Sequence, residues 1–256
     1  MRRIVAGMLG ALVALAAACG TTSTATKTTD KSKTVTTAGV GSLKGKTAAQ
    51  IIKAATTAAQ KAGSAHYVLS AVEGTSSQTI SGDASSTEGQ QAVSQGSQHI
   101  QVVYVGGVAY VQGNAAGLNS AMGFATTVAT KYANKWIAVH STDALFKSIV
   151  SAVTLAGTIA QLDPSGALTL TAPKTVAGRQ AVGVKGGLPG PAQTGVTGAT
   201  TLYVAASDPT EPLEISGTAA QGTQHVVDTG TFTNWGKALN LTAPSGAVAF
   251  SSVPTK

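Results

Sequence analysis

The chain has 256 residues and a formal net charge of +7, with 43% hydrophobic, 4% aromatic and 11% charged residues. This hydrophobic content is enough for a sizeable buried core, and the scarcity of charged side chains argues against a charged helical bundle and favours β-structure with short helices. The single cysteine, Cys19, excludes an intramolecular disulfide.

The positive charge is concentrated near the N-terminus. From Thr47 onward the chain carries ten basic and nine acidic side chains, so this part is nearly neutral. The basicity is therefore no indication of nucleic-acid binding. Lysines before residue 47 could each add about 1 kcal/mol of attraction to an anionic membrane leaflet. The alternative interpretation is that they only keep a flexible linker soluble.

Residues 1–18 have the features of a secretory signal peptide. Arg2 and Arg3 precede an uncharged apolar run that is too short to remain as a membrane-spanning helix. The run ends in Leu-Ala-Ala-Ala before Cys19, which resembles a bacterial lipobox. That resemblance implies cleavage before Cys19 and transfer of a diacylglycerol to its thiol, giving an extracytoplasmic protein anchored to the cell membrane. An ordinary signal peptide with an unrelated cysteine is the alternative.

Residues 19–46 are expected to form the lipidated cysteine and a disordered tether rich in threonine and lysine. Nine of the seventeen residues from Thr21 to Thr37 are threonine, and no aromatic residue is present. Thr47 and Gln50 form a capping-box pattern, and apolar residues then recur at helical spacing over 48–62, with Gly63 as the stop. The sequence therefore predicts one folded domain over 47–256.

Strands are expected next, and then two helical segments. A polar stretch separates two predicted hairpins, the second with Gly106-Gly107 as its turn. Apolar spacing predicts one amphipathic helix from Leu118 to Tyr132 and another segment over 143–154, continued by a last turn to Leu162. The expected strands are 66–73, 77–82, 99–105, 108–112, 135–139, 168–171, 180–184, 200–205, 213–216 and 224–233. This order predicts an α+β fold with one strongly curved antiparallel sheet, an unclosed barrel with helices on its concave face.

Motifs for catalysis or metal binding are absent from the sequence. It has no G-x-S-x-G, H-E-x-x-H or S-x-x-K motif, and its histidines lie far apart. We therefore expect no catalytic residue, no metal and no cofactor. The remaining polar candidates are expected on exposed positions, mostly the solvent side of strands; they are His66, His99, His140, His225, Arg179, Glu214 and Asp228.

Five segments in order resemble actinobacterial lipoproteins of the LppX/LprG type, whose fold is LolA-like. The likeness spans most of residues 48–245 and follows the lipobox and the threonine-rich tether. It implies an unclosed antiparallel barrel wrapped over helices, with a lipid-binding cavity between them. This chain differs from that pattern in having few large apolar side chains. The segments are 62–68 (AGSAHYV), 103–111 (VYVGGVAYV), 134–139 (NKWIAV), 202–204 (LYV) with 211–213 (EPL), and 232–237 (FTNWGK).

Three functions are compatible with these features. The leading hypothesis is a non-enzymatic, membrane-anchored carrier of a lipid or lipidated molecule in the cell envelope. The second is a structural or interaction lipoprotein with a closed core, and the third, less favoured, is a lipid-anchored hydrolase. The partners expected for the carrier are a lipid or acylated glycolipid ligand, the membrane through acylated Cys19, and an envelope transporter, but no nucleic acid.

Small side chains on facing helices and strands leave an apolar cavity unless the core packs fully. In each strand, the alternating set without charged or amide side chains is expected to face the helices. The residues expected to line the cavity are Val68, Ile100, Val102, Tyr104, Leu118, Met122, Leu145, Phe146, Ile149, Val153, Leu202, Val204, Leu213 and Ile215.

Overall fold

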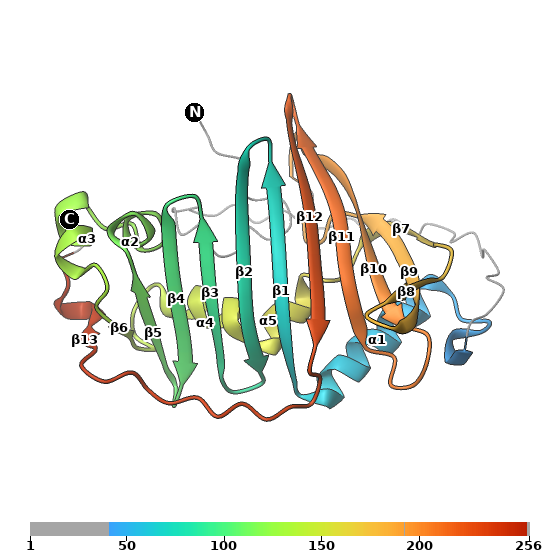
Figure 1. Cartoon of the computed structure of the whole chain (residues 1–256), viewed down its shortest axis with the longest axis horizontal. Helices are drawn as coiled ribbons and strands as arrows, with labels where there is room; N and C mark the ends of the chain where they lie inside the picture. The colour runs from blue at the N-terminus through green and yellow to red at the C-terminus, as the bar shows by residue number, and fades with distance from the viewer. Residues whose placement is uncertain (1–40, 192, 255–256) are drawn as a thin grey trace.

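The computed structural model describes residues 41–191 and 193–254, which form one large curved sheet with helices on one side (Figure 1). The sheet has thirteen strands. They are β1 Ser64–Glu73, β2 Ser76–Ser85, β3 Gly89–Gln95, β4 Gln98–Val105, β5 Val108–Gly113, β6 Ile137–Val139, β7 Ser165–Leu170, β8 Lys174–Val176, β9 Arg179–Gly187, β10 Thr197–Ala205, β11 Pro212–Gln221, β12 Gln224–Thr233 and β13 Val248–Ala249.

The sheet is open at both ends and almost wholly antiparallel. Its strand order is β13-β6-β5-β4-β3-β2-β1-β12-β11-β10-β9-β7, with β8 also beside β9. Only the short pair β13 and β6 is parallel among the described strands. The first long strand, β1, therefore lies in the middle of the sheet beside the last long strand, β12. The predicted α+β fold with an unclosed antiparallel barrel is confirmed.

The helices lie on the concave side of the sheet, which is the far side in the view of Figure 1. Helices α4 and α5 cross behind β2, β3 and β4, and α1 lies behind the half that contains β9 and β11. Helices α2 and α3 close the end near β4 and β5. Their bounds are α1 Ala48–Ala62, α2 Ala115–Met122, α3 Thr126–Tyr132, α4 Phe146–Val153 and α5 Leu155–Ala160. No described helix has the length and apolar character needed to cross a membrane.

Local signals placed the first helix and one hairpin correctly. The Thr47 hydroxyl accepts a hydrogen bond from the Gln50 amide (3.3 Å), while the Gln50 side chain accepts one from the Thr47 amide (2.8 Å). Gly63 ends α1 in the left-handed conformation, with φ of 78°. The turn between β4 and β5 requires positive φ at both central residues, which Gly106 and Gly107 supply.

The folded part begins earlier than the sequence indicated. A short 3₁₀ helix covers Gly41–Leu43, and the Leu43 side chain is only 4% exposed within the main hydrophobic core. The Ser42 amide and hydroxyl both donate to the Ala206 carbonyl oxygen, at 2.8 and 2.9 Å. Residues 41–46 therefore belong to the folded body, and their assignment to a disordered tether was wrong. The signal peptide, Cys19 and the tether up to residue 40 lie outside the described residues.

Two further elements differ from the prediction. The polar stretch between the predicted hairpins contains β3, which pairs with β2 and β4 along its whole length. The helix predicted from Leu118 to Tyr132 is two helices, α2 and α3, because Gly123 adopts φ of 69° and ends α2. The short strands β8 and β13 were not predicted either.

Candidate functional site

The candidate site is a small cavity between the concave face of the sheet and helices α4 and α5. Its volume is about 40 Å³. A buried water needs roughly 10–15 Å³ measured in this way, so the space corresponds to only a few waters. The cavity lies over the central strands, where β1 and β12 pair. Its lining residues are Tyr67, Leu69, Ile80, Gln91, Ala152, Thr158, Gln161, Leu162, Ile215, Asp228 and Thr229.

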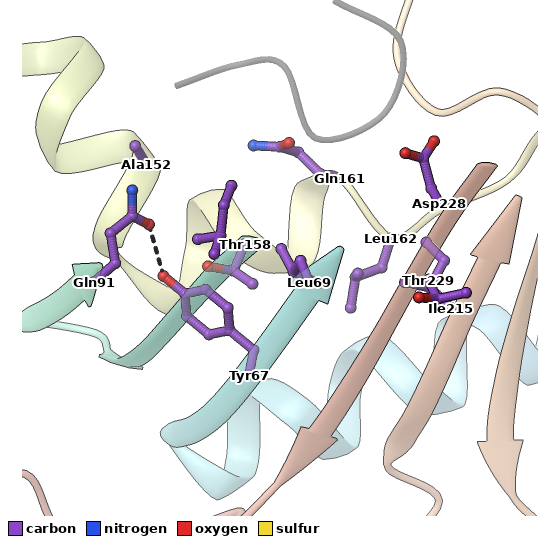
Figure 2. Close-up of a pocket in the computed structure, with 11 residues that line it drawn as sticks. Tyr67, Leu69, Gln91, Ala152, Thr158, Gln161, Leu162, Ile215, Asp228 and Thr229 are labelled. Atoms are coloured by element: carbon purple, nitrogen blue, oxygen red, sulfur yellow. Dashed lines mark hydrogen bonds between the residues drawn. The ribbon is translucent and has the colours of Figure 1, made fainter. Parts of the chain in front are cut away.

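A buried tyrosine forms one wall of the cavity. Tyr67 lies 1% exposed on β1, and its ring crosses Gly82 of β2 to donate a hydrogen bond to Gln91 Oε1 on β3 at 2.9 Å (Figure 2). A Cβ at position 82 would lie 2.6 Å from the tyrosine oxygen, so glycine is what lets the ring lie across the strand. Burial, and secondarily the charge of Asp83, raises the pKa of the Tyr67 phenol, which stays protonated as a donor.

Asp228 brings an unpaired carboxylate to the cavity. Its side chain lies on the concave face of β12, 4% exposed, and neither carboxylate oxygen has a hydrogen-bond partner among the described residues. Burial raises the pKa of Asp228 to about 6, because the charged form loses its hydration there. The expectation that Asp228 faces solvent was wrong, since alternation places it on the same face as the buried Phe232.

The cavity has an apolar part and a polar part. Asp228 and Gln161, a residue just after α5, lie along one edge of the cavity in Figure 2. The apolar side chains of Leu69, Leu162 and Ile215 lie on its other side. The site can therefore surround apolar groups and offer hydrogen-bonding groups at one end. Apolar walls with a few convergent polar groups are typical of sites for small molecules.

The structure distributes the predicted lining residues mainly over the packed core. Ile215 is the one predicted residue that lines the cavity. Leu213 packs in a separate small cluster with Val176, Ala181 and Ala205, beside the irregular pairing of β10 with β11. The others in the main core, or packed against it, are Ile100, Val102, Tyr104, Leu118, Met122, Leu145, Phe146, Ile149, Val153, Leu202 and Val204.

Val68 was placed on the wrong face. It lies on the convex side of β1 and is 37% exposed, while its neighbours Tyr67 and Leu69 face the cavity. The prediction chose the set with Val68 because the opposite set contains the charged Glu73. Glu73 lies at the end of β1, beside the turn to β2, where its side chain is only partly buried. A charged residue at the end of a strand therefore does not determine which face of that strand is buried.

Because Val68 lies on the exposed face and Val102 in the core, the same Val→Thr substitution should affect stability differently at the two positions. Val68→Thr should change the free energy of unfolding by less than about 0.5 kcal/mol, as is usual at exposed positions. Val102→Thr places a hydroxyl at a 4% exposed core position and should cost at least about 1 kcal/mol. Urea unfolding of both variants checks the assignment, and similar losses at the two positions would contradict it.

The sequence analysis missed Tyr67, Gln91 and Asp228 as cavity residues. For Asp228 a signal was present, because it shares strand parity with Gly230 and Phe232. For Gln91 no signal was present, because the composition of β3 did not indicate that this segment forms a strand. In each case burial depends on the neighbouring strands and helices, not on local propensity.

The other polar groups that the sequence singled out are dispersed and mostly paired. His66 Nδ1 lies 2.8 Å from Asp83 Oδ1, and Arg179 donates to Glu211 at 2.8 Å. Within residues 41–191 and 193–254, no three His, Cys, Asp or Glu side chains come together as a potential metal site. These groups therefore form local pairs and supply no metal-binding cluster in the described part.

A second, open groove lies between α1 and the loop 208–211. It has a volume of about 1010 Å³ and is lined by both small apolar and charged side chains. Its basic residues are Lys44, Lys46, Lys53 and Lys61. Two of these lysines were assigned to the tether, but they belong to the folded body. The groove is solvent-open and lacks the enclosed apolar walls of the inner cavity.

Comparison with known proteins gives similarity to solved structures only. No known protein family matches the chain, and no curated protein sequence matches it. LprF from Mycobacterium bovis is similar at 14% identity and a TM-score of 0.48, covering 78% of this chain and 97% of that one. The lipoprotein LppX from Mycobacterium tuberculosis gives 12% identity and a TM-score of 0.43, covering 75% and 97%.

A third similar structure is a putative outer membrane lipoprotein-sorting protein domain from Vibrio parahaemolyticus. It gives 5% identity and a TM-score of 0.29, covering 73% of this chain and 92% of that one.

Proposed function

We propose that the protein is a non-enzymatic, membrane-anchored lipoprotein that binds the acyl chain of a lipid between the concave sheet and helices α4 and α5. The observation that carries the proposal is the apolar cavity at this place, walled by Leu69, Ile80, Leu162 and Ile215. Burying an acyl chain there gains about 0.8 kcal/mol for each methylene. The acylated Cys19 would hold the protein in the cell envelope, where such lipids occur.

The size of the cavity sets a condition on binding. Sites for small molecules usually have at least about 300 Å³, whereas this cavity has about 40 Å³. Binding an acyl chain therefore requires α5 and the following segment to move away from β1 and β2. Helix α5 has only six residues, Leu155–Ala160, and contains Gly157. Its displacement would expose Leu155 and Ile159, which α5 buries in the main core, so the bound acyl chain would have to replace their lost packing.

A second function is favoured by the same small cavity volume. The small cavity and the dense core also suit a closed lipoprotein that serves as an interaction platform in the envelope. In that case the polar groups beside the cavity would have no ligand. The two functions differ in whether lipid is present in the purified protein.

Native mass spectrometry distinguishes them. The protein would be exported with an ordinary cleavable signal peptide in place of residues 1–18 and with Cys19→Ala, so that no covalent lipid is present. Residues 41–46 must be retained, because Leu43 belongs to the core. Lipid that co-purifies at a fixed stoichiometry supports the carrier. A folded protein that never carries lipid, even after incubation with envelope lipid extract, contradicts it.

Filling the cavity should remove lipid binding at little cost in stability. Ala152 lines the cavity from α4, and Ala152→Leu adds three carbon atoms there. Ala129→Leu is the matched control, because Ala129 is fully buried in α3 and does not line the cavity. We expect Ala152→Leu to lose bound lipid and Ala129→Leu to cost about 1–3 kcal/mol through overpacking. Lipid retained by Ala152→Leu would place the ligand elsewhere.

A further inference from the structure

The net positive charge of the folded body is concentrated on one face. The described residues carry eleven basic and nine acidic side chains. Of these, four lysines and two acidic residues, Asp208 and Glu211, line the open groove beside α1. Seven basic and seven acidic side chains remain elsewhere in residues 41–191 and 193–254, so the groove accounts for the whole excess. We call this surface, which carries Lys44, Lys46, Lys53 and Lys61, the α1 face.

The lysines of the α1 face have no acidic partner. All four are exposed, and none takes part in an ion pair within the described part of the chain. Glu211 is held by Arg179 at 2.8 Å, which leaves Asp208 as the one acidic residue without an ion pair among the described residues that line the groove. Helix α1 itself contains no acidic residue. Because unpaired like charges repel one another, contact with a negatively charged surface would stabilise this face.

Helix α1 presents its lysines on a single side. Lys53, Thr57 and Lys61 are four residues apart and all line the groove. The opposite side of the helix is buried in the main core through Ile51 and Ala55. The groove-lining residues between the two helical lysines are only alanine and threonine. The longer lysine side chains therefore project furthest, and their ammonium groups can meet a flat surface together.

The N-terminal chain enters the folded body beside this face. The Ser42 amide and hydroxyl donate to the Ala206 carbonyl oxygen, two residues before Asp208, where the opposite wall of the groove begins. Cys19 is 22 residues before Gly41 in the sequence. A chain of that length spans at most about 75 Å. A chain anchored at Cys19 therefore joins the body at the α1 face and keeps it within that distance of the membrane.

We propose that the α1 face lies on the anionic lipid surface of the membrane that holds Cys19, and that this contact fixes the orientation of the body. The inference goes beyond the proposed function, because the folded body makes a second contact with the membrane, and this contact requires no lipid in the inner cavity. Lysine ammonium groups attract the phosphate groups of anionic lipids, and each lysine near such a surface raises the affinity about fivefold. The charges on the rest of the described body are balanced, so no other face competes for this contact.

Vesicle sedimentation tests the contact without the covalent lipid. The mature chain with Cys19→Ala would be mixed with vesicles of phosphatidylcholine alone or of phosphatidylcholine with phosphatidylglycerol. We expect binding to the anionic vesicles only, and weaker binding as salt is raised, because salt screens exposed charges. Removing two charges by Lys53→Gln with Lys61→Gln should lower the binding constant about 25-fold.

The matched control is Lys147→Gln with Lys185→Gln, which removes the same charge from exposed positions on α4 and β9. We expect this pair to bind nearly as tightly as the parent chain. Equal losses for the two pairs, or no loss for either, would show that the total charge or the segment before residue 41 drives the binding, and would overturn the inference. Absence of binding to anionic vesicles at low salt would overturn it as well. Neither result touches the carrier function, which is tested by lipid that co-purifies.

A spin label reports the orientation directly. Because Cys19 is the only cysteine, the Cys19→Ala chain accepts a single new cysteine for labelling. Thr57 lies on the α1 face, and Thr79 is exposed on the convex face of β2. On anionic vesicles the label at Thr57→Cys should lose accessibility to a water-soluble nickel chelate, while the label at Thr79→Cys should keep it. Equal protection of both labels, or protection at Thr79→Cys alone, would contradict the proposed orientation.

Discussion

Replacing Cys19 by alanine should move the protein from the membrane fraction to the soluble fraction almost completely. Stable anchoring generally takes two acyl chains, and the diacylglycerol implied by the lipobox supplies them. Without the thiol the diacylglycerol has no attachment point. The body should keep its fold, because the sequence predicts that Cys19 lies outside the folded domain.

The measurement is fractionation followed by intact mass. Because lipobox cleavage depends on Cys19, the Cys19→Ala chain needs an ordinary signal peptide so that the apolar segment 4–18 is removed. The control is the native chain, whose mature mass should exceed that of the polypeptide from residue 19 by the mass of the lipid. A correctly cleaved Cys19→Ala protein that still sediments with membranes would refute lipidation as the anchor.

Asp228→Asn should stabilise the protein at pH 8, by about 1–3 kcal/mol. The pKa of Asp228 is about 6 in the folded state, against 3.8 for an aspartate in an unfolded chain. Above pH 6 the carboxylate is charged in both states, and the folded state bears the cost of burying that charge, at about 1.4 kcal/mol per pKa unit. As pH falls from 6 to below 3.8 the group becomes neutral first in the folded and then in the unfolded state, and the cost is lost. The gain from Asp228→Asn should therefore be fully present at pH 8 and mostly lost at pH 4.

Urea unfolding at the two pH values gives the comparison. Asp83→Asn is the control, because it should lower the free energy of unfolding at pH 8 where Asp228→Asn should raise it. Although burial raises the pKa of Asp83, hydrogen bonds from Gln90 and His66 outweigh it and lower the pKa. The Asp83 carboxylate therefore stabilises the fold at pH 8 and loses that effect as pH falls. A gain from Asp228→Asn that is equal at pH 4 and pH 8 would show that the charge of Asp228 is not its cause.

The fold could be predicted well from the sequence where local chemistry decides the outcome. The capping box at Thr47 and the paired glycines at 106 and 107 fixed element boundaries, and the order of elements gave the curved antiparallel sheet. Strand β3 could not be recognised, because Val93 is the only β-branched or aromatic residue among its seven. It is held by pairing on both sides with β2 and β4, which is information that no local window contains.

The candidate site was much less predictable than the fold. Periodicity identified the inward face of β4, with Ile100, Val102 and Tyr104, but not whether those side chains line a cavity or fill a core. That difference depends on how closely α4 and α5 approach the sheet. The position of Asp228 violates the rule that charged residues face water. Such violations are expected at functional sites, where stability is lost for the sake of a ligand.

The pairing of β1 with β12 has a consequence for how the chain is made. Residues 64–113 form a meander of neighbouring strands, and residues 165–221 form another, but only β12 joins them. Its partner β1 lies about 160 residues earlier in the chain, so this contact closes a long loop. Such long-range pairing is slow compared with the formation of hairpins. During synthesis and export, β1 and β11 therefore remain open edges until residues 224–233 have emerged, and the two halves of the sheet are joined only then.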